Sequence, residues 1–401
     1  MKKKVLFVIN TLSRAGAETA LLALLRVLLQ EPVEISVYVV LGQGEMRRDL
    51  PGEVTVLNRS YSDTSVLSKE GRRCLKKTVL RSFFRHGKWI RKSVYILKNA
   101  VDMAKRGRIL PDKLLWRMIS DGGEILSEQY DLAVAYLEGG AAYFTADHVN
   151  AKKKAAFIHI SYTDAGYTKK LDLDCYAAFD RIFAVSDEVR DDFISVYPQW
   201  SNKTKVFHNM IDRARIFEYA KKAGGFSDQY DGIRILTVGR LTRQKAYDIA
   251  VCAMKKLKDA GIDARWYVLG EGEERERLTR QIRELSLERE FILCGAVDNP
   301  YPYYRQCDIY IHATRFEGKS IAIQEAQCMC CPIIASDCPG NREQVAAGED
   351  GILCPLSADG IYQAAAELIA DAEKRKRLGD AAGKRQVFHP DELQMLLKLL
   401  T

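Results

Sequence analysis

The chain has 401 residues, of which 47% are hydrophobic and 28% are charged. This length suits two domains of ordinary size, and the composition excludes a disordered or fibrous protein. No apolar run reaches the ~18 residues that span a bilayer, and the first run, residues 5–9, is too short for the core of a signal peptide. We therefore expect a cytoplasmic protein without a transmembrane helix.

The net charge of +8 is concentrated in one segment. Residues 72–108 contain thirteen Lys and Arg and a single acid, Asp102, so the segment carries +12 and the rest of the chain −4. We expect this segment to dock on anionic lipid at the inner face of a membrane; the alternative is a solvated helical face. Nucleic acid is not expected as a partner, because no nucleic-acid-binding motif accompanies the charge.

Short β-branched runs alternate with helical patterns from the first residues onward. The strands expected in the first half cover 5–9, 35–41, 132–136, 155–159, 182–185 and 205–208, and a helix covers 17–29. The rhythm stops at about 62–128, where we expect a mostly helical, basic insertion. Apolar strands joined by helices predict parallel βαβ units with both sheet faces covered.

The alternation restarts at Ile233, after a polar, glycine-containing stretch at 209–232 that predicts an interdomain linker. The second half is expected to contain strands 233–238, 265–269, 291–293, 309–312 and 333–335 and helices 245–258, 272–286 and 321–329. The fold class is therefore α/β. We expect two Rossmann-like, doubly wound domains, residues 1–210 and 211–385, with a cleft between them. A tail helix over 386–401, with Pro390 at its start and one apolar face, is expected to return to the first domain.

A pair of glutamates carries the strongest chemical signal. Glu317 lies in the loop after strand 309–312, and Glu325 lies in the second turn of the next helix. Ser320 and Ile321 open that helix, so their backbone N–H groups are expected to be free to bind an anion. This arrangement suits a nucleoside diphosphate sugar. One carboxylate would accept hydrogen bonds from the sugar hydroxyls and the other from the ribose hydroxyls, with the phosphates bound between them. The alternative is two solvated acids near a helix N-terminus.

Two cations follow the first strand of the second half. Arg240 and Lys245 flank a loop that leads into a helix, where they predict an electropositive pocket for a diphosphate. In a reaction they would neutralise the charge that develops on a departing nucleotide. The alternative is a surface loop with incidental charges.

In this order the residues resemble the family 4 glycosyltransferases, which have the GT-B fold. The matching residues are Gly239, Arg240, Leu241, Lys245, Gly270, Glu317 and Glu325. The resemblance implies that a sugar moves, with retention of configuration, from a nucleotide diphosphate donor, UDP rather than GDP, to a hydroxyl of a glycan, lipid-linked or protein-linked acceptor. Arg240, Lys245 and Glu317 would be catalytic. The residues implied to bind the donor are Gly239, Gly270, Ser320, Ile321 and Glu325.

Three residues of the first half are further candidates. The Arg14–Glu18 loop is similar to the family's Gly-Gly-x-Glu loop, which implies that Gly16 approaches the donor phosphates. His159 ends a buried strand and resembles the family's catalytic-site histidine that faces the sugar. Glu138 follows a strand directly and is a candidate on the acceptor side. The chain departs from the family at two points: Ala15 and Ala246 stand where glycine is usual, which narrows the allowed backbone conformations.

We expect no essential metal and no other cofactor. Asp172 and Asp174 spell the D-x-D of metal-dependent transferases, but they follow no hydrophobic strand, and no His, Cys and carboxylate cluster has ligand spacing. Arg240 and Lys245 would supply the positive charge that a metal ion supplies elsewhere.

Two other functions stay open on the same architecture. A nucleotide-sugar epimerase would need no acceptor, so product analysis without acceptor separates it from a transferase. A non-catalytic partner protein that braces an active transferase would tolerate a degenerate site, yet the charged residues of the predicted site are all present.

Overall fold

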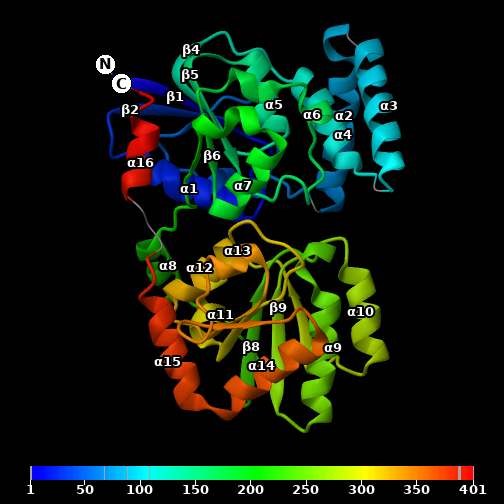
Figure 1. Ribbon diagram of the computed structural model, residues 1–401, viewed down its shortest axis with the longest axis vertical. Helices are drawn as coiled ribbons and strands as arrows, with labels where there is room; N and C mark the ends of the chain where they lie inside the picture. The colour runs from blue at the N-terminus through cyan, green and yellow to red at the C-terminus, as the bar shows by residue number, and fades with distance from the viewer. Residues whose placement is uncertain (1, 67, 88, 108, 387–389, 401) are drawn as a thin grey trace. The chain divides into compact units, whose positions relative to one another are not determined.

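The computed structural model describes residues 2–66, 68–87, 89–107, 109–386 and 390–400 (Figure 1). The chain divides into two compact units. Unit 1 comprises Met1–Met210 with His389–Thr401, and unit 2 comprises Ile211–Phe388. Each unit contains its own parallel sheet, so the predicted α/β class with two doubly wound sheets is confirmed.

Unit 1 is built on a seven-stranded sheet in the order β3-β2-β1-β4-β5-β6-β7. The strands are β1 (Lys3–Ile9), β2 (Val33–Val39), β3 (Thr55–Val56), β4 (Gln129–Ala135), β5 (Asn150–Ile158), β6 (Arg181–Ala184) and β7 (Thr204–Val206). Central strands are apolar on both faces, and residues such as Leu6, Phe7 and Val8 are fully buried. The winding reverses between β1 and β4, and doubly wound sheets bind ligands at such a point.

Helices cover this sheet and fill the expected insertion. They are α1 (Gly16–Leu28), α2 (Lys69–Phe84), α3 (Trp89–Lys105), α4 (Pro111–Asp121), α5 (Gly140–His148), α6 (Lys169–Asp172) and α7 (Asp187–Val196). Figure 1 shows α2, α3 and α4 grouped at one side of unit 1, with α3 outermost. Ser68 caps α2 and Ser186 caps α7. Each side chain accepts a hydrogen bond from a backbone N–H group of the first helical turn, which has no acceptor within the helix.

The tail helix α16 (Pro390–Leu397) belongs to unit 1. Leu393 and Leu396 are buried, and Glu392 accepts from the backbone N–H of His208 and pairs with its imidazole. The apolar face that the sequence predicted is therefore the face that packs. His389, expected to precede Pro390 at the helix start, lies outside the described residues.

Unit 2 has a six-stranded sheet in the order β10-β9-β8-β11-β12-β13, again with one reversal, between β8 and β11. Its strands are β8 (Ile233–Val238), β9 (Ala264–Leu269), β10 (Phe291–Gly295), β11 (Ile309–His312), β12 (Ile333–Ser336) and β13 (Ile352–Cys354). Its helices are α8 (Arg213–Ala220), α9 (Tyr247–Asp259), α10 (Arg275–Glu284), α11 (Tyr301–Gln306), α12 (Ile321–Cys328), α13 (Pro339–Arg342), α14 (Ala358–Ala370) and α15 (Ala372–Gly383).

Two differences from the predicted elements have physical reasons. Strand β5 begins at Asn150 rather than at residue 155, because Lys152 and Lys153 pair with Asp131 and Asp180 beside them and so join the sheet despite their charge. The short strand β13 and the helices α14 and α15 were not predicted. Three strand residues are too few for a recognisable alternation.

Candidate functional site

Two loops of unit 2 interlock at the carboxyl ends of β8 and β11, on either side of the reversal of the sheet. The backbone carbonyl of Gln244 accepts from the N–H of Arg315 at 2.8 Å and from Thr314 Oγ1 at 3.2 Å. The side chain of Gln244 donates to the carbonyl of Phe316 at 2.8 Å. Arg315 adds two bonds to Asp248 at the start of α9. These bonds bring the predicted cation loop and the predicted carboxylate loop together.

Lys245, Glu317 and His312 form one cluster at this junction. Lys245 Nζ forms an ion pair with Glu317 Oε2, and His312 Nε2 lies 3.1 Å from the same oxygen. His312 Nε2 is 3.5 Å from Lys245 Nζ, and its Nδ1 is 3.2 Å from the hydroxyl of Tyr310. An imidazole that accepts from Tyr310 at Nδ1 donates from Nε2 to Glu317. The lysine therefore keeps N–H donors for another partner.

The charges of this cluster are set by its own members. Burial acts to raise the pKa of Glu317, but Lys245 and His312 outweigh it, and the pKa falls to about 2. Burial, followed by the nearby charge of Lys245, lowers the pKa of His312, so this imidazole is neutral. The cluster thus presents a fixed carboxylate and a fixed ammonium group at neutral pH.

Arg240 stands at the entrance of the same loop. Its side chain is exposed and forms no hydrogen bond or ion pair with any other residue that the structure describes. A guanidinium group with open donors in the loop that also carries Lys245 is suited to binding a diphosphate.

Glycines in the loops after β8 and β9, among them the predicted Gly239 and Gly270, allow the two backbones to pack closely. A Cβ atom on Gly270 would lie 1.9 Å from the carbonyl oxygen of Gly239, and one on Gly272 would lie 2.2 Å from that of Leu241. Gly239 in turn accepts from the hydroxyl of Tyr247 at 2.9 Å. The loops after β8 and β9 can approach this closely only because these positions carry no side chain.

Ala246 occupies the position where the resembling family has glycine. Its backbone has φ 47° and ψ 32°, the left-handed conformation that glycine adopts without cost. The alanine thus keeps the backbone that the loop requires, at an energetic cost, and its methyl group is fully buried.

The start of α12 corrects one expectation. The backbone N–H of Ser320 is not free, because it donates to Gln344 Oε1 at 2.6 Å, while Gln344 donates back to the carbonyl of Ser320 at 2.8 Å. The Ser320 hydroxyl caps the helix by accepting from Ile323. The amide of Ile321 has no acceptor among the described residues, so the first turn retains one of the two predicted anion donors.

Glu325 is held by two tyrosines from α11 rather than lying open. Its two carboxylate oxygens each accept one hydroxyl, from Tyr301 and Tyr304, both at 3.1 Å. Burial raises the pKa of Glu325 to about 7, and the two tyrosine hydroxyls oppose that rise. Because each oxygen has a second lone pair, the ionised carboxylate can still accept from a ligand hydroxyl.

Unit 1 has its own polar cluster at the carboxyl ends of β1, β4 and β5. Glu138 Oε2 accepts from the backbone N–H of His159 at 3.0 Å, and its carbonyl accepts from Asn10 at 3.1 Å. Asn10 also accepts from the amide of Ala141 at 2.7 Å, which fixes the start of α5. Burial raises the pKa of Glu138. The structure brings Glu138 and His159 together, two of the three candidate residues of this unit.

The imidazole of His159 is the unusual group of this cluster. Its ring packs on Tyr136 with centroids 4.9 Å apart, and its Nε2 is buried without a hydrogen-bond partner among the described residues. Burial lowers the pKa of His159 to about 3, so the ring is neutral at physiological pH. A buried imidazole nitrogen without a partner is costly unless a ligand meets it. Gly16 is the exposed first residue of α1 in the same unit.

The Asp172-Leu173-Asp174 sequence is structural. The fully buried carboxylate of Asp172 accepts from the hydroxyls of Tyr143, Tyr162 and Tyr197 at 2.6–2.8 Å. Within the described ranges no group of three or more His, Cys, Asp and Glu is arranged to hold a metal ion. The expectation of a metal-independent site stays a prediction.

The sequence-based prediction missed His312, Tyr301, Tyr304, Asn10 and Gln344. His312 and Asn10 had a usable signal, since each directly ends or follows a central strand. The tyrosines of α11 and Gln344 reach the site from segments that carry no motif.

Comparison with known proteins agrees with this geometry. Residues 227–385 match the family model described as glycosyl transferases group 1. A Campylobacter jejuni protein named N-acetylgalactosamine-N,N'-diacetylbacillosaminyl-diphospho-undecaprenol 4-alpha-N-acetylgalactosaminyltransferase is 28% identical over 212 residues, which are 52% of this chain and 56% of that protein. The amylovoran biosynthesis glycosyltransferase AmsD of Erwinia amylovora is 23% identical over 59% of this chain and 66% of its own length. The chain thus spans little more than half the length of the first of these relatives.

Solved structures resemble the whole chain. The Anabaena protein Alr3699/HepE, solved with UDP and glucose, matches with a TM-score of 0.69 at 16% identity over 99% of both chains. The lipopolysaccharide outer core galactosyltransferase WaaB matches with a TM-score of 0.57 at 14% identity over 99% of both. These likenesses identify the fold as GT-B.

Proposed function

We propose that this chain, whose residues 227–385 match the family model of glycosyl transferases group 1, moves a sugar from a nucleotide diphosphate donor to an acceptor hydroxyl. The observation that carries the proposal is the Lys245, Glu317 and His312 cluster, with the exposed Arg240 in the loop that leads to Lys245. The donor is UDP-linked, a choice supported by the UDP and glucose bound to the structurally similar Anabaena protein.

The residues of unit 2 suit the chemistry of such a transfer. The bond between the anomeric carbon and the β-phosphate oxygen breaks with its electron pair going to the phosphate. Arg240 and Lys245 then neutralise the charge gained by the leaving group, without a metal ion. Glu317 accepts from hydroxyls of the sugar. The acceptor oxygen bonds to the anomeric carbon with retention of configuration, and its proton goes to a phosphate oxygen.

The acceptor is a lipid-linked or other glycan in this proposal, in keeping with the diphospho-undecaprenol named for the Campylobacter relative. Unit 1 offers the neutral His159 and the buried Glu138 to the substrates. The cytoplasm stays the predicted compartment. No helix in the described ranges is both long and apolar enough to cross a bilayer.

Release of nucleotide diphosphate tests the proposal. The protein is incubated with a panel of UDP- and GDP-sugars, with and without a glycan acceptor and with and without a chelator. We expect UDP release that depends on acceptor, survives chelation and is lost in Arg240→Ala but not in the matched surface variant Arg289→Ala. Conversion of the donor without any acceptor would instead identify an epimerase, and no turnover of any donor would contradict the proposal.

A further inference from the structure

The outer helix of the insertion, α3, exposes an apolar stripe. Ile90, Val94, Leu97 and Val101 follow one another at the four-three-four spacing of one helix face, and their exposed fractions are 46–66%. Among the described residues, eight of the eleven large hydrophobic side chains that are exposed lie within residues 80–109. A concentration of this kind on one segment marks a surface that binds a partner.

The opposite face of α3 already holds this helix on unit 1. Lys92, Ile96, Asn99 and Met103 have the same spacing, shifted by two residues, and pack inward. The buried ammonium group of Lys92 donates to the carbonyls of Ser82 and Arg85 at the end of α2, at 2.6 and 3.1 Å. Tyr95 donates to the carbonyl of Leu171 at 2.8 Å. The exposed stripe is therefore a second apolar face, which the core of unit 1 does not use.

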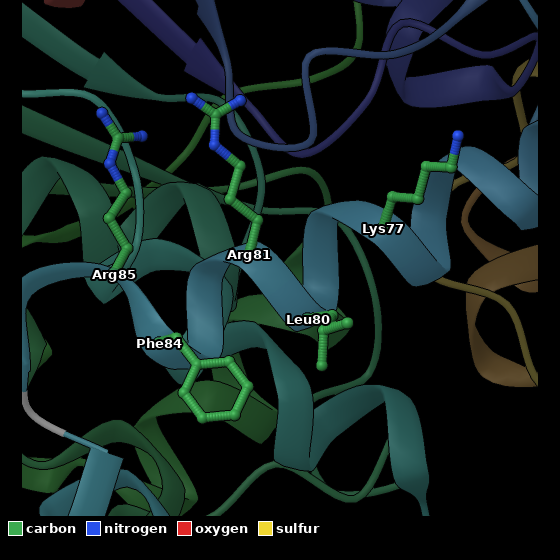
Figure 2. A pocket seen from close by; sticks show the side chains of 5 residues that line it. All are labelled: Lys77, Leu80, Arg81, Phe84 and Arg85. Carbon is green, nitrogen blue, oxygen red and sulfur yellow. The ribbon is translucent and has the colours of Figure 1, made fainter.

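Cationic and apolar side chains of the neighbouring helix α2 and its C-terminal end line an open hollow. The hollow is lined by Lys77, Leu80, Arg81, Phe84 and Arg85. Figure 2 shows the three cations pointing to one side of the helix, while Leu80 and Phe84 point to the other. Leu80 and Phe84 have exposed fractions of 63% and 62%.

Six exposed cations of the two helices are not engaged in ion pairs within the described residues. Arg73, Lys76, Lys77, Arg81, Arg91 and Lys98 are all exposed and form no ion pair with a described residue. The one acid of the segment, Asp102, is already paired with Lys170 and Arg106. Lys88 and Arg108, which also contribute to the charge of the segment, lie outside the described residues.

From this combination we propose that α2 and α3 form a docking surface for an anionic lipid bilayer. Helices that carry an exposed apolar face flanked by Lys and Arg lie in the interface of such a bilayer, where the apolar side chains enter the acyl boundary and the cations meet lipid phosphates. A water-soluble acidic partner would satisfy the cations but would leave the apolar stripe uncovered. An apolar partner helix would leave the cations unpaired.

The docking surface is connected to the polar cluster of unit 1. Helix α4 packs against α2, α3 and α5, and its Trp116 closes on Gly139 and Gly140, which follow Glu138. Helix α4 thus joins the helices of the docking surface to the segment that follows Glu138. The docking itself does not depend on the proposed transfer reaction.

Vesicle sedimentation of the full chain tests the inference. The probes are vesicles of phosphatidylcholine alone and of phosphatidylcholine with phosphatidylglycerol. We expect sedimentation with the anionic vesicles only, weakening as salt rises. Lys77→Gln with Arg81→Gln should reduce partitioning roughly thirty-fold, since each cation near such a surface contributes about one factor of five. Lys205→Gln with Arg289→Gln removes two exposed cations elsewhere and should change nothing.

The apolar stripe is tested separately. Ile90→Ser with Leu97→Ser should abolish sedimentation with anionic vesicles, whereas Phe217→Ser, an exposed apolar residue of unit 2, should not. The fluorescence of the half-exposed Trp89 should shift to the blue with anionic vesicles, and Trp89→Phe should remove that shift.

Three outcomes would overturn the inference: negligible binding to both vesicle types, unchanged binding of the stripe variant, or light scattering that shows a dimer lost in the stripe variant without lipid binding. The last result would assign the stripe to a second copy of the chain. Vesicle binding without nucleotide release would instead contradict the proposed transfer and leave the docking surface intact.

Discussion

The two units carry different polar groups at the equivalent place in their sheets, the carboxyl ends of the strands where the strand order reverses. At the strand ends of unit 2, Glu317 forms an ion pair with Lys245 and a hydrogen bond with His312, and the loop before Lys245 carries the exposed Arg240. At the strand ends of unit 1, Glu138 is bound by backbone N–H groups and the neutral His159 has an unpartnered nitrogen. Unit 2 therefore holds fixed charges before any ligand arrives, whereas unit 1 offers a neutral imidazole.

This difference separates two tasks. Fixed cations are suited to a leaving diphosphate, because preorganised charge needs no rearrangement when charge develops. A neutral imidazole with an open nitrogen is suited to recognising hydroxyl groups, which require hydrogen-bond partners rather than charge. Loss of the cations of unit 2 should consequently lower turnover, and the predictions below are ordered from the largest expected effect to the smallest.

Loss of the cations should have the largest effect. Arg240→Ala and Lys245→Ala should each lower turnover by a factor of several hundred, because a lost contact to developing phosphate charge costs ~3–4 kcal/mol. Lys245→Arg should recover only part of the activity, since a planar fork replaces a compact charge. Donor kinetics measure the effect, and thermal melts identify misfolding. Near-normal turnover in both folded alanine variants would move the donor site elsewhere.

The ionised carboxylate of Glu317 should stabilise unit 2 at pH values where it is fully ionised in both the folded and the unfolded chain. Because its pKa falls from 4.5 to about 2 in the folded chain, its contribution is complete above the unfolded value of about 4.3 and is lost as pH falls toward 2. The loss amounts to about 3 kcal/mol. Urea unfolding between pH 2 and 6 should show it in the unmodified chain and not in Glu317→Gln. Parallel curves for the two proteins would mean that the ion pair does not lower the pKa of Glu317. The same variant should lower turnover, because in the proposed reaction Glu317 accepts from hydroxyls of the transferred sugar.

Asp172 of unit 1 should show the opposite slope. Burial raises its pKa from 3.8 to about 6 against the effect of three tyrosine hydroxyls. Its contribution to stability is therefore greatest below pH 4 and declines by about 3 kcal/mol as pH rises to 6. Asp172→Asn keeps an acceptor for the tyrosines and should remove this decline. A variant that retained the full decline would show that another group is responsible.

Glu325 should make donor binding depend on pH. With a pKa of about 7, it is mostly protonated at pH 6 and mostly ionised at pH 8, so the donor KM should fall about tenfold across this range. We propose that Glu325 binds the ribose of the donor. Glu325→Gln should then raise the donor KM more than it lowers turnover and should abolish the pH dependence, because such a contact acts on ground and transition states alike. Tyr301→Phe, which removes one stabilising hydroxyl, should shift the dependence to higher pH. A pH-independent KM in the unmodified chain would exclude this role.

Ala246 should give the smallest effect. Ala246→Gly relieves a left-handed backbone but removes a buried methyl group, and the two contributions are of similar size, about 1 kcal/mol each. The free energy of unfolding should therefore stay within about 1 kcal/mol. Ala246→Val should lower it by about 2 kcal/mol or more, since a β-branched residue fits this conformation poorly. Equal stability of the valine variant would contradict the backbone assignment.

Much of the fold and of the charged site could be predicted from the sequence. Parallel strands buried on both faces are continuous apolar runs, and such runs located nearly every central strand. The placement of Arg240 and Lys245 after one strand and Glu317 after another followed from the rule that doubly wound sheets gather these loops at one edge. The three-residue strand β13 and the helices α14 and α15 were missed.

The sequence could not determine the hydrogen-bond partner of each polar group or the side of a helix that stays exposed. The N–H of Ser320 is taken by Gln344, Glu325 is bound by tyrosines of α11, and the apolar stripe of α3 faces outward although an equally spaced stripe packs inward. Each outcome depends on segments that are distant along the chain and become neighbours only when helices settle on the sheet. The local sequence pattern decides whether a segment forms a helix or a strand. A helix makes its backbone hydrogen bonds within the segment, and a central strand is specified by a short run of buried apolar residues. The pairing of side chains depends on the relative rotation of packed elements, which only the tertiary structure decides.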